Sequence, residues 1–192
     1  MKSRFKTVPK FLYVNMLNIE VKLSSDMVCI KYVSITILLF VFSALPSLAT
    51  DRIVVSKEKL LLYVITESAD TVFVAPVACG INMGNKQREG DKKTPEGVFT
   101  ICQIQNSAKW LHDFGDGKGM RKGAYGLYFF RLKVPGNTSI GIHGTCFPET
   151  VGERASDGCV RLRNEDLMEL KKYITIGMVV KILPDNLENL LM

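Results

Sequence analysis

Short runs of apolar and β-branched residues, separated by polar turns, repeat along the chain from residue 52 onward. Residues 52–78 contain three such runs, broken by "SKEK" and "ESAD", which is the rhythm of an antiparallel meander. Four further runs are "GVFTICQI", "LYFFRLKV", "SIGIHGT" and "GMVVKIL". Each run has the length of a β-strand, so the sequence predicts a mostly β fold.

One segment, residues 164–174, has helical periodicity instead. Leu167, Leu170 and Ile174 share one face of that helix. Asn164 is the candidate N-cap, with acidic residues in the first turn and lysines near the end, as the helix dipole favours. We therefore expect a mostly β fold with one or two helices.

Two polar, glycine-rich segments interrupt the predicted strands. Residues 81–96 are rich in Lys and Gly and read as a loop. Residues 106–126 are irregular and hold the only tryptophan, Trp110, together with His112. A loop of that length in a compact domain is usually functional or disordered, so this one is either a lid over a site or a poorly ordered excursion.

The N-terminal quarter of the chain has the pattern of a secretory signal. Residues 32–45 form an uncharged apolar run that follows Lys31 and precedes Ser47 and Ala49, a small-x-small cleavage pattern. This order predicts a signal peptide cleaved after Ala49. The alternative is an uncleaved signal that attaches the protein transiently to the membrane.

The signal divides the chain into residues 1–49, an N-terminal extension plus signal, and residues 50–192, one domain. About thirty residues precede the apolar run, whereas such signals begin within a few residues of it. Met27 is therefore the expected true start. We expect an exported protein of the periplasm or cell envelope.

The charge balance changes once the signal is removed. The whole chain has a net charge of +6, and residues 1–49 hold six of its 25 Lys and Arg and two of its 19 Asp and Glu. Residues 50–192 keep 19 basic against 17 acidic residues, a net charge of +2. Because most of the basic excess leaves with the signal, we expect no nucleic-acid partner.

Four cysteines remain after Cys29 leaves with the signal: Cys79, Cys102, Cys146 and Cys159. Outside the cytosol an even number of cysteines predicts disulfides. A Cys146–Cys159 bond would indicate a non-enzymatic binding protein. If Cys159 is free, Cys79 with Cys102 is the expected pair.

His143 and Cys159 are the candidate catalytic pair. They are 16 residues apart, a spacing that suits the ends of two adjacent strands joined by a loop. A thiol is nucleophilic as a thiolate, and a nearby imidazole can remove its proton. Asp157-Gly158 predicts a tight turn that exposes backbone amides beside the sulfur, where they can stabilise an oxyanion.

Two further polar residues lie near this pair in the sequence. Arg161 follows Cys159 by two residues, so both side chains lie on one face of an extended strand. Its guanidinium can lower the pKa of the thiol or bind a substrate carboxylate. The Ser156 hydroxyl can orient His143 or a substrate amide.

A zinc site is a competing interpretation of the same residues. His143, Cys146 and Cys159 supply three ligands and His112 is the fourth candidate. The spacing lacks the close cysteine pair of most such sites, so no metal site is predicted.

The segment His143-Gly144, followed by "SDGCVR" at residues 156–161, resembles the signature of the L,D-transpeptidase catalytic domain (YkuD) family. The resemblance continues at Thr94, Pro95, Gly97 and Phe99, which match the family's Thr-Pro-x-Gly-x-Phe segment, and it covers residues 51–184.

The resemblance implies a β-sandwich-like fold and a reaction on peptidoglycan stem peptides, with consequences for cell-wall biogenesis and cell shape. The thiolate attacks the carbonyl before the terminal D-alanine, forms a thioester, and an amine of a second stem resolves it into a crosslink. The acceptor could instead be a lipoprotein or water; with water the protein would be a carboxypeptidase or amidase. No metal or organic cofactor is implied.

The resemblance also implies a role for each matching residue. Cys159 would be the nucleophile and His143 its base. Ser156 and the Gly144 carbonyl would position the imidazole, and the amides of Gly158 and Cys159 would bind the oxyanion. Arg161 would bind substrate or support the loop.

One position departs from the family pattern. Asp157 stands where many members carry a second histidine between Ser and Gly. Its carboxylate either raises the pKa of the thiol or pairs with Arg154, Arg161 or Arg163.

Overall fold

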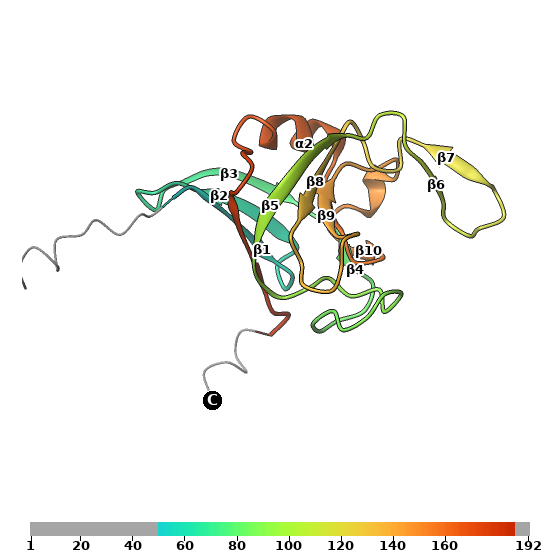
Figure 1. Ribbon diagram of the computed structural model, residues 1–192, viewed down its shortest axis with the longest axis horizontal. Coiled ribbons are helices and arrows are strands. Elements are labelled where there is room, and N and C mark those ends of the chain that lie inside the picture. Colours follow the sequence, from blue (N-terminus) through green and yellow to red (C-terminus); the bar gives the residue numbers. More distant parts are fainter. Residues whose placement is uncertain (1–49, 187–192) are drawn as a thin grey trace, which may run out of the picture. The chain divides into compact units, whose positions relative to one another are not determined.

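The computed structural model describes residues 50–186 of the 192-residue chain (Figure 1). The predicted signal peptide, its cleavage point and the Met27 start lie outside the described residues. Among residues 50–186, no helix combines the length and the apolarity that crossing a membrane requires.

Eight strands in the described part form one curled sheet, in the order β11-β9-β8-β5-β12-β1-β2-β3. In that order their bounds are Val160–Arg161, Gly141–His143, Tyr128–Leu132, Gly97–Asn106, Val179–Leu183, Arg52–Ser56, Leu61–Ile65 and Thr71–Pro76. Neighbours are antiparallel except at β1–β12 and β11–β9, which are parallel. The sheet therefore brings the two ends of the domain sequence, β1 and β12, side by side.

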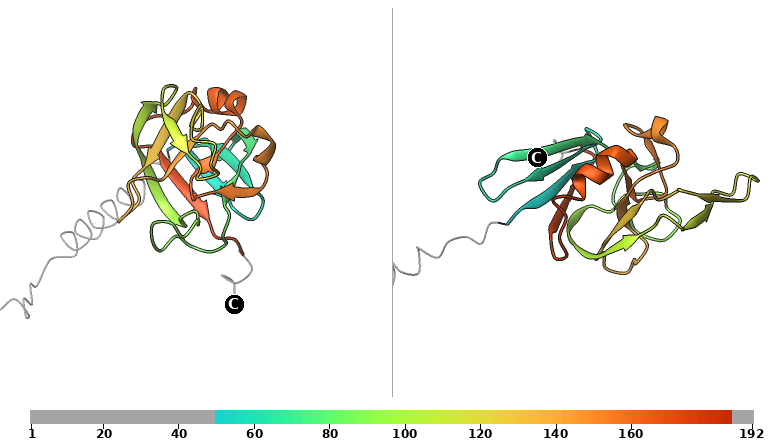
Figure 2. Two further views of the ribbon diagram at one scale, coloured as in Figure 1. Left: turned by 90° about the vertical axis from the view of Figure 1, so that its right-hand side faces the viewer. Right: turned by 90° about the horizontal axis from the view of Figure 1, so that it is seen from above.

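Smaller elements complete the domain. They are the parallel pair β4 (Cys79–Gly80) and β10 (Arg154–Ser156), the hairpin β6 (Leu111–Asp113) and β7 (Met120–Lys122), the 3-10 helix η1 (Pro148–Thr150) and the helix α2 (Asn164–Leu170). Figure 2 shows α2 over one face of the sheet and the β6–β7 hairpin projecting from the rest of the domain. The prediction of a mostly β fold with one or two helices is confirmed.

The core lies between the sheet and α2. Alternate residues of the meander strands are fully buried, among them Ile53, Val55, Leu62 and Val64. Leu167 and Leu170 of α2 are also fully buried and belong to the same cluster. Each such side chain contributes about 1.5–3 kcal/mol through burial. The buried side chains of the predicted strands and of the predicted helix therefore pack in one core.

The long segment 106–126 is not wholly irregular. It contains the β6–β7 hairpin, in which Leu111 pairs with Lys122 and Asp113 with Met120. The sequence pattern missed the hairpin because its strands have only three residues each and its connection is rich in glycine.

The prediction of Asn164 as helix N-cap is wrong. Arg163 occupies the N-cap position, without a side-chain capping bond, and α2 ends at Leu170 rather than at residue 174. The Asn164 side chain instead accepts a hydrogen bond from the Thr145 amide and donates one to the Thr145 carbonyl oxygen. A tertiary partner has therefore replaced the local capping role.

Candidate active site

Cys159 follows a tight turn between β10 and β11. Gly158, just before it, has a φ of 132°, which L side chains rarely adopt, and a Cβ there would lie 2.7 Å from the Lys93 carbonyl oxygen. The Ser156 hydroxyl donates a hydrogen bond to the Cys159 carbonyl oxygen (2.6 Å) and accepts one from the Gly158 amide (3.1 Å). Ser156 and Gly158 therefore fix the backbone that presents the sulfur.

His143 is the last residue of β9 and is buried. Its ring stacks on Phe129, with centroids 5.2 Å apart and planes 14° apart, and packs against Tyr125 at 5.0 Å. Nδ1 lies 2.6 Å from the Gly144 carbonyl oxygen. Because a carbonyl oxygen only accepts, Nδ1 carries the proton and the lone pair is on Nε2.

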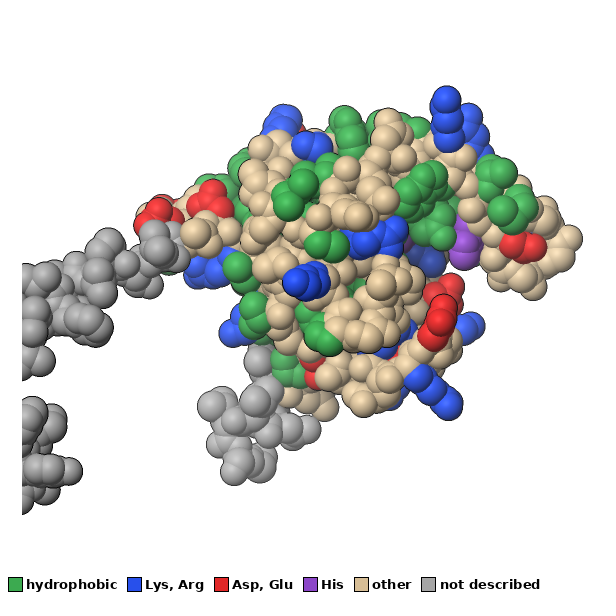
Figure 3. Space-filling model, in the orientation of Figure 1, with side chains coloured by type: hydrophobic (Ala, Val, Ile, Leu, Met, Phe, Trp, Pro, Cys, Tyr) green, Lys and Arg blue, Asp and Glu red, His purple; other side chains and the backbone are tan. Residues whose placement is uncertain are grey.

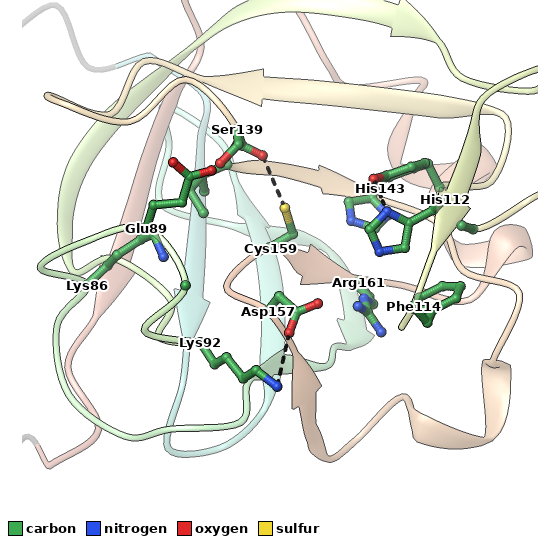
Figure 4. A pocket seen from close by; sticks show the side chains of 14 residues that line it. Lys86, Glu89, Lys92, His112, Phe114, Ser139, His143, Asp157, Cys159 and Arg161 are labelled. Atoms are coloured by element: carbon green, nitrogen blue, oxygen red, sulfur yellow. Dashed lines mark hydrogen bonds and ion pairs between the residues drawn. The ribbon is translucent and has the colours of Figure 1, made fainter. Parts of the chain in front are cut away.

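Cys159 and His143 share one face of the sheet. His143 lies opposite Arg161 across the parallel β9–β11 pair, and Cys159 precedes Arg161 by two residues. All three line one pocket of about 330 Å³ (Figure 4). The prediction that His143 and Cys159 lie at the ends of adjacent strands is confirmed.

Burial shifts the pKa values of the thiol and of the imidazole in opposite directions. Burial raises the pKa of the Cys159 thiol, against the Gly141 amide and the charges of Arg161 and Lys86, which lower it. Burial lowers the pKa of His143 from 6.5 to about 3, against the hydrogen bond to Gly144. The Cys159 thiol donates to the Ser139 carbonyl oxygen at 3.5 Å. Both shifts favour the neutral thiol and the neutral imidazole.

Arg161 supplies positive charge to the pocket. Arg161 is only 9% exposed. Its Nη1 donates a hydrogen bond to the Ala155 carbonyl oxygen at 3.3 Å. Within residues 50–186, its Nε is the one buried side-chain nitrogen or oxygen without a hydrogen-bond partner. A buried donor of this kind suits an anionic group bound in the pocket.

Two predicted positions differ from the expectation. Ser156 bonds to the turn rather than to the imidazole, because its hydroxyl is already engaged by Cys159 and Gly158. The Gly158 amide, expected to bind an oxyanion, is occupied by that same hydroxyl. The Gly144 carbonyl does contact the imidazole.

Asp157 pairs with none of the three arginines that the sequence offered. Its carboxylate lies 3.9 Å from the Lys92 ammonium, and both side chains are more than half exposed. Asp157 lines the pocket with Cys159 (Figure 4), but its side chain is 60% exposed beside the 81–96 loop, so solvent screens its effect on the thiol.

The four cysteines of the described part are unpaired. Cys79 is buried in the core, and the Cys102 thiol donates to the Arg131 carbonyl oxygen. The Cys159 thiol has a carbonyl neighbour rather than a sulfur. The Cys146–Cys159 and Cys79–Cys102 bonds considered from the sequence are thus absent here, since different elements hold each thiol against its own neighbours.

The alternative zinc site is not assembled. Within residues 50–186, no group of three or more His, Cys, Asp or Glu side chains is arranged to hold a metal ion. His112, His143 and Cys159 line the pocket, whereas Cys146 does not.

Comparison with known proteins agrees with this geometry. A family model described as the L,D-transpeptidase catalytic domain (YkuD) matches residues 50–182. The chain belongs to the L,D-transpeptidase catalytic domain family.

Curated relatives carry the same description. "Probable L,D-transpeptidase ErfK/SrfK" of Salmonella typhimurium is 26% identical over 157 residues, covering 72% of this chain and 46% of the relative. "Probable L,D-transpeptidase YbiS" of Escherichia coli K12 is 28% identical over 151 residues, covering 73% and 47%. The chain thus spans about half the length of the curated relatives it matches.

Solved structures show the same fold. The catalytic domain of the Enterococcus faecium L,D-transpeptidase has a TM-score of 0.52 at 18% identity and is covered over 99% of its length by 71% of this chain. The helical cell shape determining protein Pgp2 of Campylobacter jejuni has a TM-score of 0.53 at 21% identity, over 71% of this chain and 48% of Pgp2. The L,D-transpeptidase catalytic fold expected from the sequence is confirmed.

In this L,D-transpeptidase domain the 81–96 loop supplies a charged wall that the sequence did not predict. Lys86 lines the pocket and forms a buried ion pair with Asp91 at 2.8 Å. Burial raises the pKa of the Asp91 carboxyl, but Lys86 and the amides of Gln87, Arg88 and Lys93 outweigh it and hold that pKa well below its ordinary value. The pair fixes the loop beside the Cys159 turn. No pattern in the sequence indicates that Lys86 and Asp91 pair, so the ion pair is seen only in the structure.

A second buried ionic cluster, centred on Lys57 and Asp185, holds this loop in place. The Lys57 ammonium, 1% exposed, lies 2.6 Å from Glu96 and 3.1 Å from Asp185. Asp185 also pairs with Arg154 of β10 and accepts a hydrogen bond from the Gly84 amide. The cluster links the start of the loop to the strand that precedes the Cys159 turn.

The segment predicted as a candidate lid forms another wall. His112 and Phe114 line the pocket, and the Tyr125 hydroxyl lies 2.9 Å from His112 Nδ1. Trp110 packs behind them against Tyr125 and Phe129. Of the two residues singled out in this segment, His112 faces the pocket and Trp110 supports its wall.

Proposed function

We propose that this domain is a cysteine acyltransferase that acts on peptidoglycan stem peptides as an L,D-transpeptidase. The observation that carries the proposal is that Cys159 and His143 line one pocket while Nδ1 of His143 is bound to the Gly144 carbonyl oxygen. That bond leaves Nε2 as the proton acceptor. Membership of the family supports the choice of substrate.

The first step is acylation of Cys159. The thiol turns from the Ser139 carbonyl, gives its proton to Nε2 of His143, and the sulfur attacks the peptide carbonyl before the terminal D-alanine. A C–S bond forms and the C–N bond to D-alanine breaks. The imidazolium gives this proton to the leaving amine nitrogen, and D-alanine departs as the free amino acid. His143 is then neutral and can act as a base again.

The low pKa of His143 and the raised pKa of the thiol suit proton transfer during attack rather than before it. The developing oxyanion needs a donor, and the Cys159 amide is the one we assign, because Ser156 holds the Gly158 amide. Such a donor contributes about 3 kcal/mol. Arg161 binds a substrate carboxylate through its unpaired edge.

The second step transfers the acyl group. An amine of a second stem, or of a protein acceptor, attacks the thioester, the new C–N bond replaces the C–S bond, and the thiol is regenerated. Water in place of the amine gives a carboxypeptidase. The domain would do this work in the cell envelope, after export by the N-terminal signal, and would contribute to cell-wall biogenesis and cell shape.

Product analysis tests the proposal. Residues 50–192 are incubated with a stem tetrapeptide and an isotope-labelled amine acceptor, and the products are separated by mass. Labelled peptide with loss of D-alanine supports transpeptidation, and unlabelled tripeptide alone supports hydrolysis. Intact tetrapeptide, with the folded protein verified by circular dichroism, contradicts both activities.

A further inference from the structure

Two imidazoles line the same pocket, side by side (Figure 4). His143 is buried in β9, whereas His112 lies on the β6 strand of the hairpin and is half-buried. Figure 3 shows histidine atoms at the surface in the hollow where the hairpin joins the rest of the domain. In Figure 4 both rings lie on the side of the pocket away from Glu89 and Lys86. His112 is therefore open to a molecule that enters from solvent.

The orientation of His112 is fixed by its neighbours. The Tyr125 hydroxyl lies 2.9 Å from Nδ1, and the rings of Tyr125 and Phe114 pack edge-on at 5.5 Å and 4.5 Å. A hydroxyl can accept as well as donate, so it can take the Nδ1 proton in a hydrogen bond and leave the lone pair on Nε2. The second ring nitrogen is then the one free to meet a ligand.

Tyr125 also connects the two imidazoles. Its ring packs against His143 at 5.0 Å, and its carbonyl oxygen accepts a hydrogen bond from the Gly144 amide. A single residue thus holds both rings in one framework.

The hairpin that carries His112 is fastened to the domain. Phe114 packs edge-on against Phe147, with centroids 5.0 Å apart. The Arg121 guanidinium lies 5.3 Å from the Phe147 ring and pairs with Asp116 at 2.8 Å. These contacts hold the β6 strand at the edge of the pocket.

In the proposed transfer reaction the acceptor amine must lose two protons, and one imidazole can accept only one of them at a time. An alkyl amine reaches the site as an ammonium ion, which must lose one proton before it can attack and a second one after the C–N bond forms. His143 is buried in the pocket that also holds the Cys159 sulfur, and it can accept one of them. A second base on the solvent side is needed for the other.

We propose that His112 is the catalytic base that deprotonates the incoming acceptor amine, a role that rests on the proposed transpeptidation. Nε2 of His112 takes a proton from the ammonium group, and the free amine attacks the thioester. The second amine proton passes to His143 and then to the departing Cys159 sulfur. His112 releases its proton to solvent, which closes the balance.

The experiment separates the two half-reactions. Acyl-enzyme is formed with a stem tetrapeptide, and transfer is then timed with two acceptors: an alkyl amine, which is protonated at neutral pH, and methoxyamine, which is not. Two variants probe the base, His112→Gln and Tyr125→Phe. Leu111→Ala is the matched control, because Leu111 is the exposed neighbour whose side chain points to the opposite face of β6.

For His112→Gln we expect acylation at the wild-type rate, transfer to the alkyl amine slower by on the order of a hundredfold, and transfer to methoxyamine nearly unchanged. Tyr125→Phe should show the same selectivity with a smaller loss, and Leu111→Ala none. Equal slowing with both acceptors, or unchanged transfer to the alkyl amine, would overturn the role of His112. Absence of any amine transfer in the wild-type protein would instead contradict the proposed transpeptidation.

Discussion

The side chain of Asn164, the first residue of α2, bonds both backbone groups of Thr145, at 3.1 Å from the amide and 3.0 Å from the carbonyl oxygen. Thr145 lies two residues after His143, so this contact ties the helix to the segment that orients the imidazole. We predict that Asn164→Ala lowers the free energy of unfolding by about 1–2 kcal/mol and slows acylation.

Thermal unfolding and single-turnover acylation measure the two effects. Met168→Ala, at an exposed position of α2, is the control and should change neither. Wild-type acylation in Asn164→Ala would show that Gly144 and Thr145 keep their geometry without the helix.

The conformation of Gly158 leads to a second prediction. Gly158→Ala combines a disfavoured backbone with a clash at the Lys93 carbonyl oxygen, so it should displace the Cys159 turn and reduce acylation strongly, with a loss of about 1–3 kcal/mol in stability. Gly152→Ala isolates the backbone strain, because Gly152 has a φ of 101° and nothing within 4 Å of an added Cβ. Equal effects of the two substitutions would exclude the steric argument.

The buried imidazole predicts a pH dependence of stability. The pKa of His143 falls from 6.5 to about 3 on folding because of burial. Between these two pKa values the unfolded chain binds a proton at His143 and the folded protein does not. The free energy of unfolding therefore keeps this contribution above pH 6.5 and loses it as the pH falls toward 3. His143→Gln should remove a slope of up to about 1.4 kcal/mol per pH unit.

Denaturant unfolding at a series of pH values between neutrality and mild acid gives this slope directly. Asp91, whose pKa is held low, adds its own loss only near the ordinary carboxyl range, so the upper part of the curve reports His143. The same slope in His143→Gln and wild type would mean that the imidazole is protonated in the folded protein.

The two lysines at the pocket allow a charge test of the thiol. Lys86 is buried beside Gly158 and favours the Cys159 thiolate, whereas Lys92 is half-exposed and faces Asp157. We predict that Lys86→Met raises the pKa of the thiol and slows iodoacetamide alkylation at neutral pH by about tenfold, which corresponds to one pKa unit. Lys92→Met should have little effect. If both variants react like the wild type, Lys86 serves only to hold Asp91.

Much of the fold followed from the sequence because its signals are local. Alternating apolar residues placed β1, β2 and β12, and the Leu167 and Leu170 spacing placed the helix. Asp157-Gly158 predicted a turn just before Cys159, and the chain bends there. These features depend on neighbours within a few positions, which a sequence shows directly.

The remaining features depend on contacts between distant segments. Lys57 meets Asp185 across almost the whole described chain, and Asn164 finds Thr145 rather than its own helix end. Ser156 looked able to reach the imidazole, but its hydroxyl is nearer to the turn that it belongs to. Such partners are decided by the order of strands in the sheet, which the pattern of residues did not reveal.

The most direct test of the account is the intact mass of residues 50–192 after incubation with a stem tetrapeptide or a carbapenem. The account predicts a covalent increment that maps to Cys159, persists in Cys146→Ala, and disappears in Cys159→Ala. An increment that survives in Cys159→Ala, or no increment in the reduced and folded wild-type protein, would contradict the assignment of Cys159 as the nucleophile.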